Sequence, residues 1–244
     1  MVGVLKIVRF NWPWYLGAAA ITAAGVILIT SGILRGAAVA VAATFTLLAD
    51  FWLLASLAVS YYVYDRSAFA RGEWLNGAAL SAGCRAAVFH AGLNEAAVAT
   101  ARFLPASSVR VFDFYEPERN GTRSLKRARA QAGQKAEAIS PGRIPVDNGV
   151  LDICLVVFAA HEIRRDKERA TFFAELARTL AAGGRVYVVE HLRDAWNLLV
   201  YGPGAFHFLS RATWIRSFAG GGLAVLQERS CTPFVRVFEL GKPS

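Results

Sequence analysis

The first sixty residues of the chain contain two long apolar runs that are almost free of charge. The first run, Tyr15 to Leu34, has 20 residues and no charged side chain. As a helix it would be about 30 Å long, the thickness of the hydrocarbon core of a bilayer. The second run extends from Ala37 to about Tyr62 and is interrupted only by Asp50. A cleaved signal peptide is the alternative interpretation of the first run. Such a peptide is followed by a polar segment, whereas here a second apolar run follows. Residues 1–64 are therefore predicted to form a transmembrane helical hairpin with spans at about 15–34 and 37–62.

Basic residues near the ends of these runs predict the orientation of the hairpin. Lys6 and Arg9 precede the first span and Arg66 and Arg71 follow the second, whereas the expected turn between the spans carries only Arg35. Because basic residues concentrate on the cytoplasmic side of membranes, we expect an inner (cytoplasmic) membrane protein with both termini in the cytoplasm. The three cysteines form no CxxC pair, which fits a reducing compartment.

Asp50 is the one acidic residue within the predicted spans, roughly level with Thr22 on the returning helix. One interpretation is that Asp50 is protonated or hydrogen-bonded and ties the two helices together through Thr22. The other is that it makes a polar contact with a substrate or a partner helix that enters from the lipid.

Composition limits the class of protein further. Hydrophobic residues make up 55% of the chain and charged residues 18%, which excludes disorder and charge-rich coiled coils. The net charge of +9 includes a basic cluster at residues 119–129. Such a cluster could bind nucleic acid, but next to a membrane anchor the headgroups of a lipid bilayer are the simpler partner, and a solvated helix face is simpler still.

After a linker helix expected at about 65–85, residues 86–244 predict one α/β domain. Apolar runs typical of buried strands alternate with helical patterns, and this alternation favours a parallel sheet with helices on both faces. Helices are expected at 94–103, 124–132, 167–180 and around 214–218. Strands are expected at 86–90, 108–114, 150–159, 185–190, 223–228 and 234–240.

The segment from Ile144 to His191 carries a recognisable order of features. An acidic residue, Asp152, opens an apolar strand; a helix then ends in the pattern R-x-L-x-x-G-G, formed by Arg178, Leu180, Gly183 and Gly184. This order and spacing resemble the middle of a class I S-adenosylmethionine-dependent methyltransferase of the type 11 branch, which includes quinone-biosynthesis C-methyltransferases. The resemblance covers roughly residues 86 to 240 and implies a Rossmann-like sheet with S-adenosyl-L-methionine as the cofactor.

The resemblance also implies cofactor-binding positions. The family usually has a glycine-rich turn after its first strand, whereas this chain has the single glycine Gly92, which can still allow a close approach of the backbone. Asp113, at the end of the second strand, matches the carboxylate that holds the ribose hydroxyls. Ser140 stands where the family often has an adenine-binding Asp.

Histidines follow several predicted strands, and ligands of such sheets bind beyond the carboxyl ends of the strands. His90 ends the strand expected at 86–90, and His161 and His191 follow the strands expected at 150–159 and 185–190. We expect His161 to be the general base, because the strand before it matches the fourth strand of the family and residues after that strand face the transferring methyl there, with His191 second. A metal site formed by His161, His191 and His207 lacks supporting sequence spacing, so no metal is expected.

An insertion at about 194–210 interrupts the α/β alternation and is predicted to be a lid over the site. Its apolar side chains could line a substrate pocket or enter the bilayer. The candidate substrate-contacting residues are His207, Trp196, Tyr201 and Phe206.

These features favour a membrane-anchored methyltransferase that acts on a lipophilic, membrane-resident small molecule such as a quinone, an isoprenoid or a lipid. The alternative is a catalytically inactive methyltransferase-like subunit that docks into a membrane protein complex through its hairpin. An RNA-modifying enzyme is disfavoured by the two spans, and nucleic acid is not an expected partner. A nicotinamide dehydrogenase would require a G-x-G-x-x-G turn, which is absent.

Overall fold

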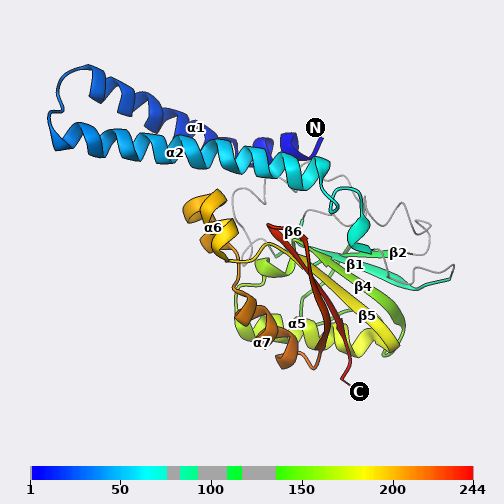
Figure 1. Ribbon diagram of the computed structural model, residues 1–244. Coiled ribbons are helices and arrows are strands. Elements are labelled where there is room, and N and C mark those ends of the chain that lie inside the picture. The colour runs from blue at the N-terminus through cyan, green and yellow to red at the C-terminus, as the bar shows by residue number, and fades with distance from the viewer. Residues whose placement is uncertain (1, 76–82, 93–108, 117–135, 244) are drawn as a thin grey trace.

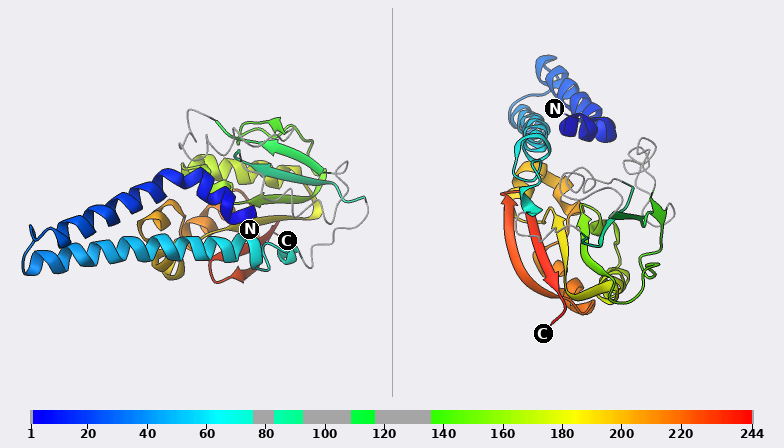
Figure 2. Two further views of the ribbon diagram at one scale, coloured as in Figure 1. Left: turned by 90° about the horizontal axis from the view of Figure 1, so that it is seen from above. Right: turned by 90° about the vertical axis from the view of Figure 1, so that its right-hand side faces the viewer.

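The computed structural model describes residues 2–75, 83–92, 109–116 and 136–243. Two long helices, α1 (Val2–Thr30) and α2 (Ala37–Tyr61), form an antiparallel pair that runs along one end of an α/β domain and extends beyond it (Figures 1 and 2). The chain reverses over residues 31–36, with Gly32 and Gly36 at positive φ. The first helix therefore ends four residues earlier than the apolar run, because a glycine conformation at residue 32 begins the turn.

Both helices are long and apolar enough to cross a bilayer, and only 6% of either candidate span is buried within the protein. Their outward side chains include Leu16, Ile27, Phe45, Leu47 and Leu54, each more than half exposed. A core helix of a soluble protein would bury such residues. The helices therefore expose an apolar surface that would be more stable out of contact with water.

Within the pair, polar and small residues meet at the helix–helix contact. The Thr22 hydroxyl donates a hydrogen bond to Asp50 Oδ1 at 2.5 Å, which confirms the interpretation of Asp50 as a tie between the helices. Gly25 lies against Thr46 so closely that a Cβ added at Gly25 would be 2.1 Å from Thr46 Oγ1. Such small-residue contacts let helix backbones approach in lipid.

The start of α1 is held by Asp65, in the π-helical turn that directly follows α2. The backbone N–H groups of Gly3 and Val4 donate to the two carboxylate oxygens of Asp65 at 2.9 and 2.8 Å. A carboxylate at the first turn of a helix satisfies orphan donors and complements the helix dipole. This contact closes the open end of the hairpin.

The linker differs from the expected helix over 65–85. A π-helical turn (Tyr62–Arg66) and a 3-10 turn (Glu73–Leu75) flank hydrogen-bonded turns, and residues 76–82 lie outside the described residues. The helix stops because Ser67 has an extended backbone and its hydroxyl oxygen accepts the N–H of Phe69 at 3.1 Å. Serine side chains compete with helical backbone bonds in this way.

Within the described residues, the sheet has seven strands in the order β3-β2-β1-β4-β5-β7-β6, with β7 antiparallel to its neighbours. Six of the seven correspond to strands predicted from the sequence, and β1 has the predicted bounds. The strands are β1 (Ala86–His90), β2 (Val109–Asp113), β3 (Glu137–Ala138), β4 (Leu151–Val157), β5 (Leu180–Glu190), β6 (Ala224–Thr232) and β7 (Val235–Gly241).

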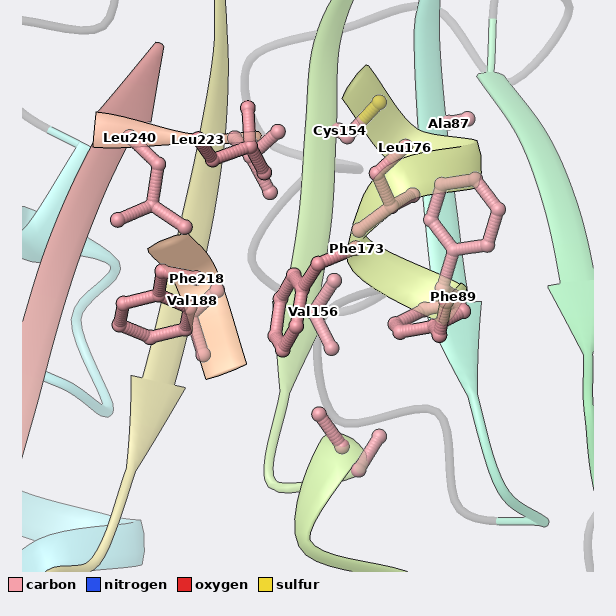
Figure 3. Close-up of a cluster of buried hydrophobic side chains, with 14 of the residues drawn as sticks. Ala87, Phe89, Cys154, Val156, Phe173, Leu176, Val188, Phe218, Leu223 and Leu240 are labelled. Atoms are coloured by element: carbon pink, nitrogen blue, oxygen red, sulfur yellow. The ribbon is translucent and has the colours of Figure 1, made fainter. Parts of the chain in front are cut away.

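Alternate residues of the central strands supply two separate cores. On one face, Val156 and Val188 pack with Phe173 of α5 (Asp166–Thr179) and Phe218 of α7 (Arg211–Gly220), as Figure 3 shows. On the other face, Leu155 and its neighbours pack against Val63 at the end of the hairpin and against the linker residues Phe69, Trp74 and Leu75. The linker thus fixes the hairpin to the sheet through a buried apolar contact.

The two helices described on the sheet agree with those predicted near 167–180 and 214–218. The α5 helix ends at Thr179, before the glycine pair, because Leu180 is already extended and pairs with Leu151 of β4. The helices predicted at 94–103 and 124–132, and the basic cluster at 119–129, lie outside the described residues.

Candidate functional site

The carboxyl ends of the parallel strands bring the predicted site residues to one edge of the sheet. His90 ends β1 and is the register partner of Asp113, which ends β2. The turn after β4 carries His161, and His191 directly follows β5. Parallel strands place the groups that follow them on a common edge, which is where open α/β sheets bind ligands.

One end of this edge contains the predicted cofactor positions. Gly92 has φ +94°, and its N–H donates to Nδ1 of His90 at 3.1 Å. The buried Asp113 accepts the N–H of Tyr115 at 2.9 Å and lies 3.8 Å from the His90 ring nitrogen. Ser140 follows β3 and is exposed. The carboxylate and the positive-φ glycine therefore lie on adjacent strands of the same edge.

His161 lies between two carboxylates. Its Nδ1 is 2.8 Å from Oε2 of Glu190, the last residue of β5, and its Nε2 is 3.4 Å from Oε1 of Glu162. Burial by itself would lower the pKa of His161, but the charges and hydrogen bonds of Glu190 and Glu162 outweigh it and raise the pKa to about 10. In return, the ring holds the pKa of the Glu162 carboxyl well below its usual value, against the effect of burial. His161 is therefore an imidazolium at neutral pH.

The short 3-10 turn that carries His161 and Glu162, η4 (Ala160–Glu162), is fixed from beneath by a buried arginine. Arg169 of α5 is fully buried, donates to the carbonyl of Ile163 at 2.8 Å and also donates to the Ser217 hydroxyl of α7 at 2.8 Å. A buried guanidinium with several hydrogen-bond partners can satisfy all of them in only a narrow range of positions. The site turn is thus rigidly attached to both helices of this face.

His191 has the opposite protonation state. Its Nδ1 lies 2.8 Å from the carbonyl oxygen of Phe234, so Nδ1 carries the proton and Nε2 can accept a hydrogen bond. Burial, together with the positive charge of His161, lowers the pKa of His191 to about 4. The site therefore contains a protonated histidine after β4 and a neutral one after β5.

The hairpin and an aromatic cage surround His191. The hydroxyl of Tyr64, from the end of the hairpin, is 3.3 Å from His191 Nε2. Phe158 and Phe208 stack on the His191 ring with centroid distances of 4.8 and 5.0 Å, and Tyr201 meets its edge. Phe158 has φ +47°, a conformation that a phenylalanine rarely adopts. Strain of this kind collects at functional sites.

The predicted lid folds over both histidines. It consists of α6 (Ala195–Tyr201) and the 3-10 turn η5 (Gly202–His207). His207 meets the ring of His161 edge-on at 5.1 Å, while the next residue, Phe208, stacks on His191. The first turn of α6 is capped by Asp194, whose Oδ1 accepts the N–H of Asn197. Glu162 of the turn after β4 contacts both His161 and His207, so it links the lid to the edge of the sheet.

The lid also packs on helix α2. The indole N–H of Trp52 donates to the carbonyl of Leu199 at 3.2 Å, and a Cβ added at Gly202 would lie 2.6 Å from the Trp52 ring. Burial raises the pKa of the Tyr201 phenol, an effect that a hydrogen bond with Ser60 of α2 partly offsets. In Figure 1, α6 lies directly below α2, to one side of the sheet. Trp196, Leu199 and Phe206 remain 59%, 54% and 66% exposed.

The sequence predicted which histidines lie at this edge of the sheet, but it did not predict three of the residues that contact them, Glu190, Tyr64 and Phe158. Glu190 had a detectable signal, since it is a charged residue at the end of a buried apolar strand and such residues need a partner. Nothing in the sequence pointed to Tyr64 or Phe158. Their contacts with His191 depend on how the end of the hairpin and the strained residue after β4 pack against that ring.

Comparisons with known proteins support the fold. No protein-family model matches the sequence, and no curated protein matches it. Among solved structures, the chain is similar to a SAM-dependent methyltransferase from Aquifex aeolicus (TM-score 0.52, 14% identity, 74% of this chain and 90% of that one). It also matches a protein described as a putative type 11 methyltransferase from Sulfolobus solfataricus (TM-score 0.45, 15% identity, 66% and 85%).

Together with the strand order, the similarity to the Aquifex aeolicus structure defines the class of fold. The domain has the Rossmann-like fold of class I S-adenosylmethionine-dependent methyltransferases, preceded by two long apolar helices. At 14% identity the similarity shows the fold and not the reaction.

Proposed function

We propose that this protein is a membrane-anchored S-adenosylmethionine-dependent methyltransferase that acts on a lipophilic, membrane-resident small molecule. The observation that carries the proposal is the position of His191, which is contacted by Tyr64 of the hairpin and by Tyr201 and Phe208 of the lid. The strand edge that binds ligands in this fold is thus built together with the apolar helices.

The cofactor positions fit S-adenosyl-L-methionine. Asp113 supplies a buried carboxylate for the ribose hydroxyls, and Gly92 has the positive φ that lets the backbone approach a ligand. Ser140 would lie beside the adenine. When bound there, the cofactor supplies an electrophilic methyl group on a positively charged sulfur.

The protonation states argue for an exchange of the two histidine roles expected from the sequence. His161 already carries a proton, so its imidazolium can donate a hydrogen bond or stabilise negative charge but cannot accept a proton. His191 is neutral, and its Nε2 lone pair points to Tyr64. We assign His191 as the proton acceptor, with Tyr64 either holding the acceptor hydroxyl or relaying its proton.

The apolar surroundings of this pair indicate the substrate class. Aromatic rings cover His191 on both faces, and the exposed apolar residues of the lid continue the surface of helix α2. An acceptor that lives in the membrane, such as a quinone, an isoprenoid or a lipid, could reach His191 between the lid and α2 without crossing water.

Calorimetric titration of S-adenosylmethionine and S-adenosylhomocysteine into the full chain in detergent tests the cofactor assignment. We expect micromolar binding that is lost in Asp113→Ala and retained in Asp152→Ala, whose carboxylate pairs with Arg85 at the opposite end of its strand. Absence of binding at millimolar cofactor would contradict the proposal and favour a methyltransferase-like subunit of a membrane complex.

Transfer of a labelled methyl group to extracted membrane lipids tests the acceptor class. We expect labelled product in the organic phase with the wild-type chain and a loss of about 100-fold or more in rate with His191→Gln, the usual contribution of a general base. Label that appears only in water-soluble products would contradict a membrane-resident acceptor.

A further inference from the structure

Two histidines and one glutamate converge beside the proposed active site in an arrangement that the methyl-transfer chemistry does not require. His161 and Glu162 come from the turn after β4, and His207 comes from the lid. Their potential ligand atoms all lie within 4.8 Å of one another. We propose that His161, Glu162 and His207 bind a divalent transition-metal ion of the zinc type.

The separations of these atoms suit metal ligands better than hydrogen bonds. Oε1 of Glu162 is 3.4 Å from Nε2 of His161 and 3.5 Å from Nε2 of His207, both at the long limit for a hydrogen bond. Two ligands that each lie about 2.0–2.1 Å from a tetrahedral zinc ion are about 3.3–3.4 Å apart. One carboxylate oxygen therefore has the required spacing to both imidazoles.

The position of the His161 ring is already fixed for coordination. Its Nδ1 is 2.8 Å from Oε2 of Glu190, and its backbone N–H donates to Oε1 of the same residue at 3.3 Å. Metal-binding histidines commonly give their other ring N–H to a carboxylate, which sets the tautomer and strengthens the donor atom. Coordination of the ion by Nε2 would displace the proton that this nitrogen carries in the metal-free imidazolium, and that proton would be released to solvent. Glu190 is 1% exposed, so it can act only through the groups that surround it.

The charges at this turn also favour a cation. Glu162 and Glu190 are both buried, and buried carboxylates require positive partners. Without a metal ion their shared partner is the His161 ring, and a bound ion would supply the positive charge in its place. Arg164 Nη1 donates to the His207 carbonyl at 2.8 Å, whereas Nη2 lies 2.7 Å from Nε2 of His207 and would have to turn away from that nitrogen when an ion binds. The Arg164 side chain is 38% exposed, which leaves it room to do so.

The ligand types select the class of ion. Two imidazoles and one carboxylate match catalytic zinc sites and related first-row metal sites, which keep at least one position open. Magnesium and calcium prefer oxygen ligands alone. Because His207 is on the lid and the other two ligands are on the sheet edge, the ion would also fasten the lid over the site. Its open position would take an oxygen atom of the acceptor.

Zinc binding to the full chain in detergent, after removal of any histidine tag, tests the site directly and without cofactor. With a competing chelator to set free zinc, we expect one ion per wild-type chain at micromolar free zinc. Glu162→Gln and His207→Gln should lose it, and Glu190→Gln should weaken it by about 10- to 100-fold. Glu228→Gln, which changes a carboxylate paired with Arg211, and Cys231→Ser, which removes a partly exposed thiol, should bind as the wild type does.

Equal zinc binding by the wild type, Glu162→Gln and His207→Gln would overturn the assignment, as would binding that is lost only with Cys231. Because a variant could fail to fold, the wild-type chain is also titrated with Co²⁺. An intense visible absorption band typical of a four-coordinate site supports the proposal, and its absence contradicts it. These results do not depend on cofactor binding, so failure here is distinguishable from failure of the proposed methyltransferase function.

Discussion

The ion pair between His161 and Glu190 dominates the electrostatics of the site. The pKa of His161, raised to about 10, lies above its ordinary value of 6.5. A raised histidine pKa adds stability that is fully present below about pH 6.5 and is lost as the pH rises through about 10. Folding and the charge of the site are therefore coupled on the alkaline side of neutrality.

Glu190→Gln tests this coupling. Loss of the carboxylate should bring the pKa of His161 down and should reduce the free energy of unfolding at pH 7 by about 1.5–3 kcal/mol, the usual value for a hydrogen bond to a charged group. Thermal unfolding of the metal-free protein in detergent, from pH 6 to 10, measures this loss of stability. The wild type should lose stability across this range, and Glu190→Gln should lose less, whereas the control Glu228→Gln should retain the wild-type slope. Parallel slopes in all three proteins would contradict the assignment of the charge to His161.

Phe158 offers a second test, because its backbone has φ +47° while its ring stacks on His191. Phe158→Ala and Phe158→Gly both remove the ring, but only glycine adopts this conformation without a steric cost. We expect Phe158→Gly to be more stable than Phe158→Ala by about 1 kcal/mol, measured by thermal unfolding. The order is reversed at ordinary strand positions, so a less stable glycine variant would show that the backbone is not strained.

Among the helices, the contact between α1 and α2 depends on a glycine. A Cβ at Gly25 would lie 2.1 Å from Thr46 Oγ1, whereas Gly17 on the same helix has no atom within 4 Å of such a Cβ. Gly25→Val should force the helices apart at a cost of about 1–3 kcal/mol, as overpacking does, and Gly17→Val should have little effect. Thermal unfolding in detergent, followed by circular dichroism, compares them. Equal stability of the two variants would mean that the helices do not meet at residue 25.

The packing of the lid on α2 can also be tested at a glycine. Gly202 has φ +52° and lies against the Trp52 ring, whereas the nearest atom to a Cβ at Gly204 is 3.9 Å away. Gly202→Ala should displace the lid and reduce methyl transfer by about tenfold or more, as small misplacements at active sites do, while cofactor affinity remains unchanged. Gly204→Ala should behave as the wild type. Unchanged transfer in Gly202→Ala would show that the lid does not need α2.

The positions of the strands were more predictable from the sequence than the paths of the segments that pack against them. Central strands such as β1 and β4 are continuous apolar runs, and buried parallel strands require that pattern, so their positions followed from composition. The linker was not predictable, because the helix stops at a side-chain hydrogen bond of Ser67 and then packs as turns on the sheet. The strand-end histidines were found for the same topological reason as the strands. The contact of His207 with Glu162 was not predictable from the sequence, because it depends on the path that the lid takes over the site.

The arrangement of the whole molecule constrains how it can meet a membrane. The lid contacts α2 at Trp52, ten residues before Tyr62 and therefore about 15 Å along the helix from that end. Half the thickness of a bilayer core is also about 15 Å. If α2 crosses the membrane steeply, the lid lies within the leaflet and not above it. The exposed Trp196, Leu199 and Phe206 are then the surfaces that meet the acyl chains.

An environment-sensitive fluorophore on the lid measures this depth. In a Cys231→Ser background, since Cys84 and Cys154 are buried, Trp196→Cys and the control Lys167→Cys are labelled and the protein is placed in vesicles. We expect quenching by lipids with brominated acyl chains at residue 196 and none at residue 167, which is exposed on α5. Quenching at neither site would place the lid in water. The acceptor would then have to leave the bilayer to reach His191, because the aromatic residues around that histidine open to the membrane only if the lid is immersed in it.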